Sequence, residues 1–264
     1  MSTLVMGILN VTPDSFADGG RHFTFADAIG RAEVMIDEGV DIIDVGGEST
    51  RPGAVRVDEE EELKRVIPVI EEIAKLGAVV SVDTMRSNVA KAAIKAGARY
   101  VNDVSGGLAD PKMSSVIASN SQVQYIAMHW RGHSENMAEL ARYNDVVSDV
   151  RRELATRTEV LVTEGVDPDQ IIIDPGLGFS KEPEHNWALL KGLDRIALLG
   201  FPLLIGASRK RFLGELLGGA PTDDREFATI AVTAILAREG VWGVRTHSVK
   251  AHKDAIKVVE RWNE

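Results

Sequence analysis

Eight short apolar runs, each with the composition of a buried strand, alternate with longer amphipathic segments along this chain. This alternation is typical of βα units on a parallel sheet, whose strands are covered on both faces and are therefore apolar almost throughout. The expected strands lie near residues 4–10, 40–47, 78–84, 99–104, 123–130, 170–175, 202–208 and 241–247. Eight parallel strands are the number that closes a (β/α)8 barrel, so we expect an α/β protein with the TIM-barrel fold.

The segments between the strands carry apolar residues at helical spacing, with charged residues on the opposite face. One such stripe consists of Phe25, Ala28, Ala32 and Met35. Thr24 and Asp27 match a capping box, and Asp58 precedes a run of four glutamates that favour the positive end of the helix dipole. These patterns predict helices that begin directly after residues 24 and 58.

The chain has 264 residues, which suits one barrel of about 250 residues. No linker or low-complexity segment divides it, so we expect a single domain over residues 1–264. Residues 11–24 and 48–57 depart from the alternation of strand and helix segments, and we expect them to be long loops with glycine and proline after strands 1 and 2. A barrel enzyme carries its active-site loops at these places.

Composition excludes several classes of function. The formal net charge of −10 argues against nucleic acid as a partner. No apolar stretch is long enough to span a bilayer and no signal segment begins the chain, so we expect a cytoplasmic protein without a membrane partner. With zero cysteines, disulfides and thiolate chemistry are excluded. The chain also lacks the glycine-rich motifs of nucleotide cofactor sites.

Polar residues follow the ends of the expected strands, at Asn10, Asp83, Asn102, His129, Asp174 and Lys210. In a barrel the carboxyl ends of all strands meet at one mouth, so these side chains become neighbours. The aspartates and asparagines supply hydrogen-bond acceptors, whereas arginines and lysines near strands 7 and 8 supply cations. The combination predicts a ligand with an edge rich in N–H groups and an anionic tail.

Each acceptor also has a structural alternative. Asp174 could brace the Pro-Gly bend that follows it, and Asp83 could cap the next helix. Either Asn102 or Asp103 could simply end its strand. His129 could be a packing residue, and its role stays open.

A cationic segment directly follows strand 7 and consists of Ser208, Arg209, Lys210 and Arg211. It opens a helix whose first N–H groups attract anions, and strands 7 and 8 commonly build the phosphate site of such barrels. Arg245 and His247 end strand 8 beside it. We therefore expect a phosphate or pyrophosphate group here. In the alternative, two of the cations pair with surface carboxylates.

The loops after strands 1 and 2 offer a metal ligand and an oxyanion contact. Asn10 opens a segment with oxygen ligands that suit Mg²⁺, but no carboxylate cage surrounds it, so substrate phosphates would have to complete the shell. Arg51, between Thr50 and Pro52, suits contact with an oxyanion, although an ordinary turn is the alternative.

Six segments together resemble the dihydropteroate synthase family of bacterial folate biosynthesis, and the resemblance runs from about Met6 to Trp262. The segments are residues 7–16 (GILNVTPDSF), 44–53 (DVGGESTRPG), 81–84 (SVDT), 101–107 (VNDVSGG), 174–179 (DPGLGF) and 208–210 (SRK). The resemblance implies that hydroxymethyl-dihydropterin pyrophosphate condenses with para-aminobenzoate to dihydropteroate and pyrophosphate. It also implies Mg²⁺ and a homodimer.

The same resemblance assigns roles to single residues. The pterin ring would bind to Asp83, Asn102, Asp174 and Lys210. The pyrophosphate would bind to Arg245 and His247, with Asn10 at the metal and with Thr50 and Arg51 closing over it. The walls of the aminobenzoate pocket would be Phe16, Pro52 and Phe179.

Two departures from the family pattern affect this assignment. Arg211 stands where many members carry serine, so either Arg211 or backbone N–H groups would bind the aminobenzoate carboxylate. Ser248 stands where aspartate is common, which leaves the group that orients His247 to be found.

Three rival functions remain. One is a pterin-binding methyltransferase barrel, and a second is a non-catalytic pterin-binding paralogue. The third is an aldolase that uses Lys210 for a Schiff base.

Overall fold

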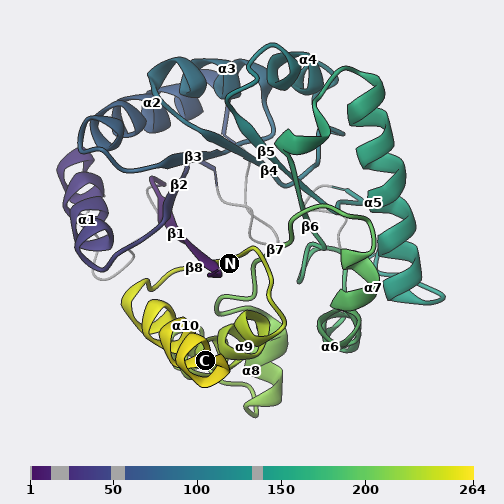
Figure 1. Cartoon of the computed structure of the whole chain (residues 1–264). Coiled ribbons are helices and arrows are strands. Elements are labelled where there is room, and N and C mark those ends of the chain that lie inside the picture. The colour runs from purple at the N-terminus through teal and green to yellow at the C-terminus, as the bar shows by residue number, and fades with distance from the viewer. Residues whose placement is uncertain (1, 13–23, 49–56, 133–138) are drawn as a thin grey trace.

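The computed structural model describes residues 2–12, 24–48, 57–132 and 139–264, which form a ring of parallel strands surrounded by helices (Figure 1). The strands are β1 (Leu4–Asn10), β2 (Ile42–Gly46), β3 (Val80–Asp83), β4 (Tyr100–Asp103), β5 (Gln124–Met128), β6 (Ile171–Asp174), β7 (Leu204–Ile205) and β8 (Gly243–Thr246). All eight lie within the expected ranges, so the predicted barrel is confirmed. The loops predicted at residues 11–24 and 48–57 fall largely outside the described residues.

The sheet has the strand order β6-β5-β4-β3-β2-β1-β8-β7, and neighbouring strands run parallel. One bridge between Ile173 and Leu203 joins β6 to β7, where the ring would otherwise stay open. The barrel is therefore nearly closed, with its shortest strand at the seam.

Helices connect the strands and cover the outside of the ring. Those before β6 are α1 (Phe25–Asp37), α2 (Glu59–Lys75), α3 (Ser87–Ala96), α4 (Met113–Ala118) and α5 (Val146–Thr163). Those after β6 are α6 (Pro183–Lys191), α7 (Leu193–Ala197), α8 (Arg211–Leu216), α9 (Glu226–Arg238) and α10 (Lys250–Asn263). Two short 3-10 helices cover Pro168–Gln170 and Asp223–Arg225. In the described part of the chain, no helix has the length and apolar character needed to cross a membrane.

Both helix starts that the sequence predicts are confirmed. Thr24 and Asp27 form the reciprocal capping box of α1, and the Asp58 side chain accepts from the backbone N–H of Glu61 at the start of α2. The buried face of α1 consists of Ala28, Ala32 and Met35. Capping thus fixes where each helix begins, and burial of the apolar stripe fixes its rotation against the sheet.

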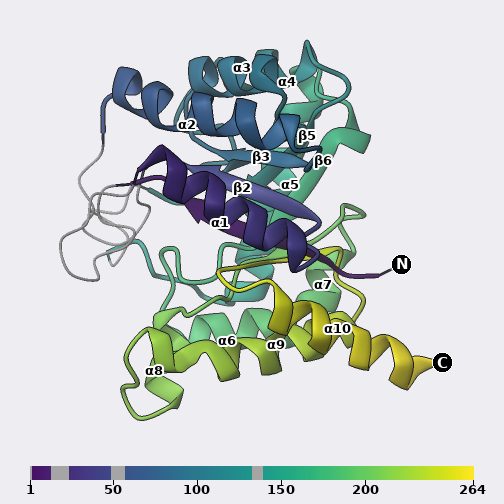
Figure 2. The same cartoon turned by 90° about the vertical axis from the view of Figure 1, so that its left-hand side faces the viewer.

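The barrel interior is apolar toward the end where the strands begin and polar toward the mouth, where the strands end. A separate apolar cluster fills its middle and consists of Met6, Ile42, Ile126, Ile172 and Leu204, with Leu4, Tyr100 and Trp242 packed against it. Both chain termini lie at the end of the barrel where the strands begin (Figure 2). Because side chains of a strand alternate between faces, the residue two positions after each interior apolar residue faces the interior nearer the mouth.

Candidate active site

Strand alternation places a polar layer directly above the apolar cluster. Two positions after Ile42 stands Asp44, two after Ile172 stands Asp174, and two after Leu204 stands Gly206. The fully buried Asp44 was not among the candidates from the sequence, because it lies inside a strand. The available signal was its spacing from Ile42, which places both on the same face.

Arg245 lies at the centre of this layer, between two buried carboxylates. Its Nε donates to Asp44 Oδ2 at 2.6 Å, and its Nη2 donates to Asp83 Oδ2 at 2.7 Å. Asn102 donates from Nδ2 to the same Asp44 oxygen at 2.9 Å. Four residues from β2, β3, β4 and β8 therefore form one hydrogen-bonded network.

The Asp83 carboxyl is held in a mixed environment. Burial raises its pKa to about 7, against the opposing effect of the Arg245 guanidinium. The capping alternative for Asp83 is wrong, because α3 begins at Ser87 and has Arg86 at its N-cap. Of Asn102 and Asp103, it is Asp103 that simply ends β4. Its carboxylate accepts from Ser105, Gly107 and Tyr125.

The two oxygens of Asp174 have different surroundings. Oδ1 accepts from the backbone N–H of Gly176 at 2.7 Å, so the bracing role weighed as the alternative is present. Oδ2 faces Gly206: a Cβ atom added there would lie 3.8 Å from Asp174 Oδ2 and 3.9 Å from Lys210 Nζ. The Asp174 carboxylate and the Lys210 ammonium therefore border the same space, which Gly206 leaves open because it has no side chain.

Lys210 is the inward cation of the segment after β7. Its Nζ donates to the Leu177 carbonyl and lies 4.9 Å from the centroid of the Phe179 ring. Burial lowers the pKa of Lys210 to about 8, although Asp174 opposes this change. Lys210 and Phe179, both predicted for the site, are thus in contact.

The two arginines of the segment pair with carboxylates, which confirms the surface alternative for two of its cations. Arg209, whose φ is +56°, donates from Nε to Glu226 at 2.7 Å and from Nη1 to Asp223 at 3.2 Å. Arg211 has a side chain that is 72% exposed and lies 3.1 Å from Glu215. The structure does not bring Arg211 to the other site residues.

Ser208 orients His247. Its hydroxyl lies 2.8 Å from His247 Nδ1, and the backbone N–H of His247 donates to the same oxygen at 3.2 Å. Ser248 instead donates to Glu226, which belongs to the neighbouring network of Arg209. Ser208, which follows the adjacent strand β7, therefore orients His247 in place of the aspartate that is common at position 248.

Asn10 ends β1 opposite Gly46. A Cβ atom at Gly46 would lie 3.4 Å from Asn10 Oδ1 and 3.7 Å from Asp83 Oδ2, so the two oxygens border one space. The described residues include no group of three acidic, histidine or cysteine side chains placed to hold a metal ion. An amide oxygen at the mouth fits Mg²⁺ only if substrate phosphates and water supply most of the shell.

Four predicted site residues lie outside the described part of the chain. They are Phe16, Thr50, Arg51 and Pro52. Their roles stay predictions from the resemblance.

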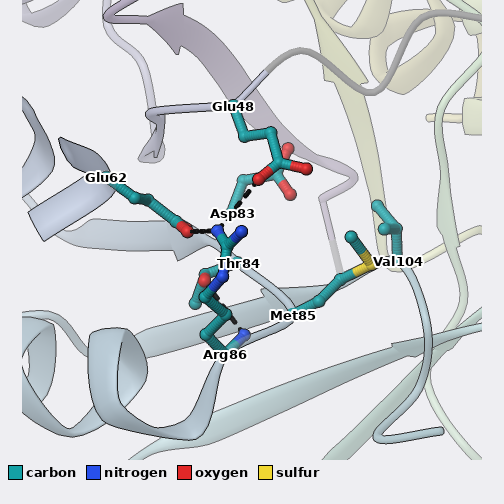
Figure 3. Close-up of a pocket in the computed structure, with 7 residues that line it drawn as sticks. All are labelled: Glu48, Glu62, Asp83, Thr84, Met85, Arg86 and Val104. Carbon is teal, nitrogen blue, oxygen red and sulfur yellow. Dashed lines mark hydrogen bonds and ion pairs between the residues drawn. The ribbon is translucent and has the colours of Figure 1, made fainter. Parts of the chain in front are cut away.

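A small pocket lies beside Asp83 and is lined by Glu48, Glu62, Asp83, Thr84, Met85, Arg86 and Val104 (Figure 3). Arg86 lies between Glu48 and Glu62, and its Nη1 donates to both. Nη2 donates to the carbonyl of Val57 at 2.5 Å. Burial raises the pKa of Glu62, and Arg86 opposes that rise. This ion pair fixes the start of α2 against the end of β3.

Comparison with known proteins identifies the family and the fold. Residues 6–247 match the model of the family described as pterin binding enzyme. A dihydropteroate synthase of Mycobacterium leprae is 52% identical, over 98% of this chain and 93% of the relative.

Two solved structures have the same fold. One is the Xanthomonas albilineans dihydropteroate synthase with 4-aminobenzoic acid, at 41% identity and a TM-score of 0.92, covering 99% of this chain and 93% of that one. The other is the enzyme from the same organism with 7,8-dihydropteroate, at 38% identity and a TM-score of 0.89, covering 99% and 94%.

Proposed function

The chain belongs to the pterin-binding enzyme family as a dihydropteroate synthase, and from that premise we propose how its own residues carry the reaction. The enzyme is a transferase of folate biosynthesis, which condenses hydroxymethyl-dihydropterin pyrophosphate with para-aminobenzoate to dihydropteroate and pyrophosphate. The observation that carries the proposal is the gathering of buried acceptors and one ammonium around Gly206 and Arg245.

The pterin ring binds above the apolar cluster, where its N–H groups meet Asp174 Oδ2 and the acceptors of Asp83 and Asn102. Lys210 donates to the ring oxygen and nitrogen edge. A ligand without these N–H groups would leave a buried carboxylate without a partner, which costs about 1 to 3 kcal/mol or more. The polar layer thus selects the heterocycle.

The pyrophosphate binds at the ends of β7 and β8. His247, oriented by Ser208, and the remaining donors of Arg245 meet the charge that develops as pyrophosphate leaves. Mg²⁺, held by Asn10 and the phosphates, supplies further neutralisation of that charge when bound. An arylamine is uncharged near neutral pH, so the nucleophile needs no dedicated base.

The experiment that tests the activity is release of pyrophosphate from the pterin substrate. We expect release only when para-aminobenzoate and Mg²⁺ are both present. Release of pyrophosphate that does not depend on para-aminobenzoate would contradict the transferase activity. Release that persists in excess chelator would contradict the requirement for Mg²⁺. A ketose phosphate trapped on Lys210 by borohydride would support the aldolase instead.

A sulfonamide that mimics para-aminobenzoate should compete with that substrate. Phe179 lies beside Lys210 and is the described member of the proposed aromatic wall, so both molecules would pack against the same ring. In initial-rate measurements, the apparent KM for para-aminobenzoate should rise with sulfonamide concentration at constant maximal rate. Inhibition that does not depend on the concentration of para-aminobenzoate would contradict the proposal that both molecules bind in the same pocket.

A second copy of this chain is proposed to cover the outer face of α9. Phe227, Ala231 and Ile235 lie four residues apart along this face, and Phe227 is 84% exposed. Because α9 also buries its opposite face, the helix is apolar on both sides, which is typical of a covered helix. In sedimentation velocity, Phe227→Asp should convert a dimer to a monomer, whereas Lys112→Asp should not. A wild-type monomer at micromolar concentration would contradict the homodimer.

A further inference from the structure

Lys181 is a buried cation that the mechanism above does not use. It lies in the segment between β6 and α6, and only 7% of the residue is exposed. Burial lowers the pKa of its amine to about 7. A buried amine is costly unless its N–H groups find partners, so its contacts indicate what it stabilises.

The Lys181 amine joins its own segment to the end of β5. Nζ lies 3.0 Å from His129 Nδ1 and donates to the Phe179 carbonyl at 3.0 Å. The first contact reaches the end of the neighbouring strand β5, and the second holds the backbone of Phe179. Lys181 therefore connects Phe179 to β5.

His129 is fixed as the acceptor of this contact. A carboxylate only accepts, so Nε2 carries the hydrogen that points to Glu153 Oε2 at 2.9 Å, and Nδ1 of the neutral ring accepts from Lys181. Burial and the nearby Lys181 lower the pKa of His129 to about 4, so the ring is neutral at neutral pH. Arg131 holds the same Glu153 carboxylate at 2.9 Å. The role that the sequence left open for His129 is thus a rigid acceptor.

A second contact fixes the same short segment. Ser180 has φ of +47°, a left-handed conformation that is unfavourable for a residue with a side chain. The hydroxyl of Tyr143 donates to the Ser180 carbonyl at 3.0 Å, and the Arg131 guanidinium lies 3.9 Å from the centre of the Tyr143 ring. External contacts therefore stabilise a conformation that the segment itself does not favour.

The first half of the connection after β6 has independent supports. Asp174 is held by the sheet, since its carbonyl accepts from the N–H of His129 at 2.8 Å. The N–H of Gly178 donates to Asn186 on α6 at 2.6 Å. Loss of the Lys181 contacts would therefore free the Phe179 carbonyl and loosen the position of its ring, while leaving Asp174 in place.

We infer that Lys181 is a positioning residue, which holds Phe179 against the para-aminobenzoate through its contacts with His129 and the Phe179 carbonyl. The inference rests on the aminobenzoate pocket proposed above. It separates the two substrates, because pterin recognition depends on residues at strand ends and aminobenzoate recognition depends on the segment that Lys181 fixes.

Lys181→Met keeps the side chain as far as the ε position and removes its donors. We expect the KM for para-aminobenzoate to rise about tenfold or more, while the Kd of a pterin ligand in calorimetry changes less than about threefold. Lys191→Met, in the last turn of α6, is the matched control and should leave both values unchanged.

The absence of cysteine from the chain permits a chemical rescue. Lys181→Cys can be unfolded, alkylated with 2-bromoethylamine and refolded, which restores an amine on a side chain of lysine length. Alkylation with 1-bromopropane gives the same length without the amine. The aminoethyl protein should recover most of the aminobenzoate affinity, and the propyl protein should match Lys181→Met.

Four results would overturn the inference. They are an unchanged KM in Lys181→Met, equal kinetics of the two alkylated proteins, an equal loss of pterin affinity, and a propyl protein that fails to refold when the aminoethyl protein refolds. The last would assign Lys181 to stability alone. Competition by the sulfonamide in the wild-type protein distinguishes these failures from failure of the pocket itself.

Discussion

Replacing Asp174 with alanine should reduce pterin affinity by about 100-fold or more, because a ligand N–H group would lose a charged acceptor in a buried site. The fold should persist, since Asp174 is at the rim of the barrel and the hydrogen bond that its side chain accepts from Gly176 braces only a local turn. Calorimetric titration with a pterin ligand measures the affinity, and circular dichroism checks the fold.

Asp174→Asn is the matched variant for this experiment. Its amide oxygen can still accept from Gly176, whereas its amide nitrogen would face Lys210 and the ligand donors in place of Oδ2. We therefore expect nearly wild-type stability together with a loss of pterin affinity close to that of the alanine variant. Pterin affinity that stays unchanged in either variant would contradict the assigned role.

Replacing Arg245 with methionine should remove activity and also lower the free energy of unfolding by about 3 to 5 kcal/mol, because Asp44 and Asp83 would be left buried without their cation. Urea unfolding measures the loss. Arg261→Met changes an arginine whose side chain is 83% exposed and should shift stability by less than about 0.5 kcal/mol.

The loss of unfolding free energy in Arg245→Met should also depend on pH. The pKa of Asp83 is raised from 3.8 to about 7 in the folded protein, so between these values the folded state holds a proton that the unfolded state releases. Raising the pH through this window therefore destabilises the fold. Without Arg245 that pKa rises further, so the variant should lose more stability at pH 8 than at pH 5. Equal losses at both pH values would contradict the proposed pairing.

Much of the site could be predicted because strand ends are visible in a sequence. Asp83, Asn102 and Asp174 each end or nearly end an apolar run, and the barrel brings such residues to one mouth. Asp44 could not be recognised in the same way, since the polar residue is inside its strand. Its role follows from Arg245, which is 201 positions away in the chain.

The residue pattern alone placed the three cations after β7 in one expected anion site, and only the resemblance assigned separate roles to Lys210 and Arg211. Lys210 points inward because Arg209 adopts a left-handed backbone conformation and binds Glu226 and Asp223, whereas Arg211 is exposed on α8. Lys181 was missed altogether, since a lysine beside a serine and a glutamate resembles an ordinary surface residue. Its partner His129 comes from a different strand.

The sequence by itself determined the eight βα units, the family and the strand-end acceptors, because apolar periodicity and the residues that end each strand are local properties of the chain. Only the tertiary structure decided which polar groups share a hydrogen bond, as in Arg245 with Asp44 and Lys181 with His129. Such pairs join residues far apart in the chain, and closure of the barrel fixes the distances between them. Their energies depend on burial that no single segment contains.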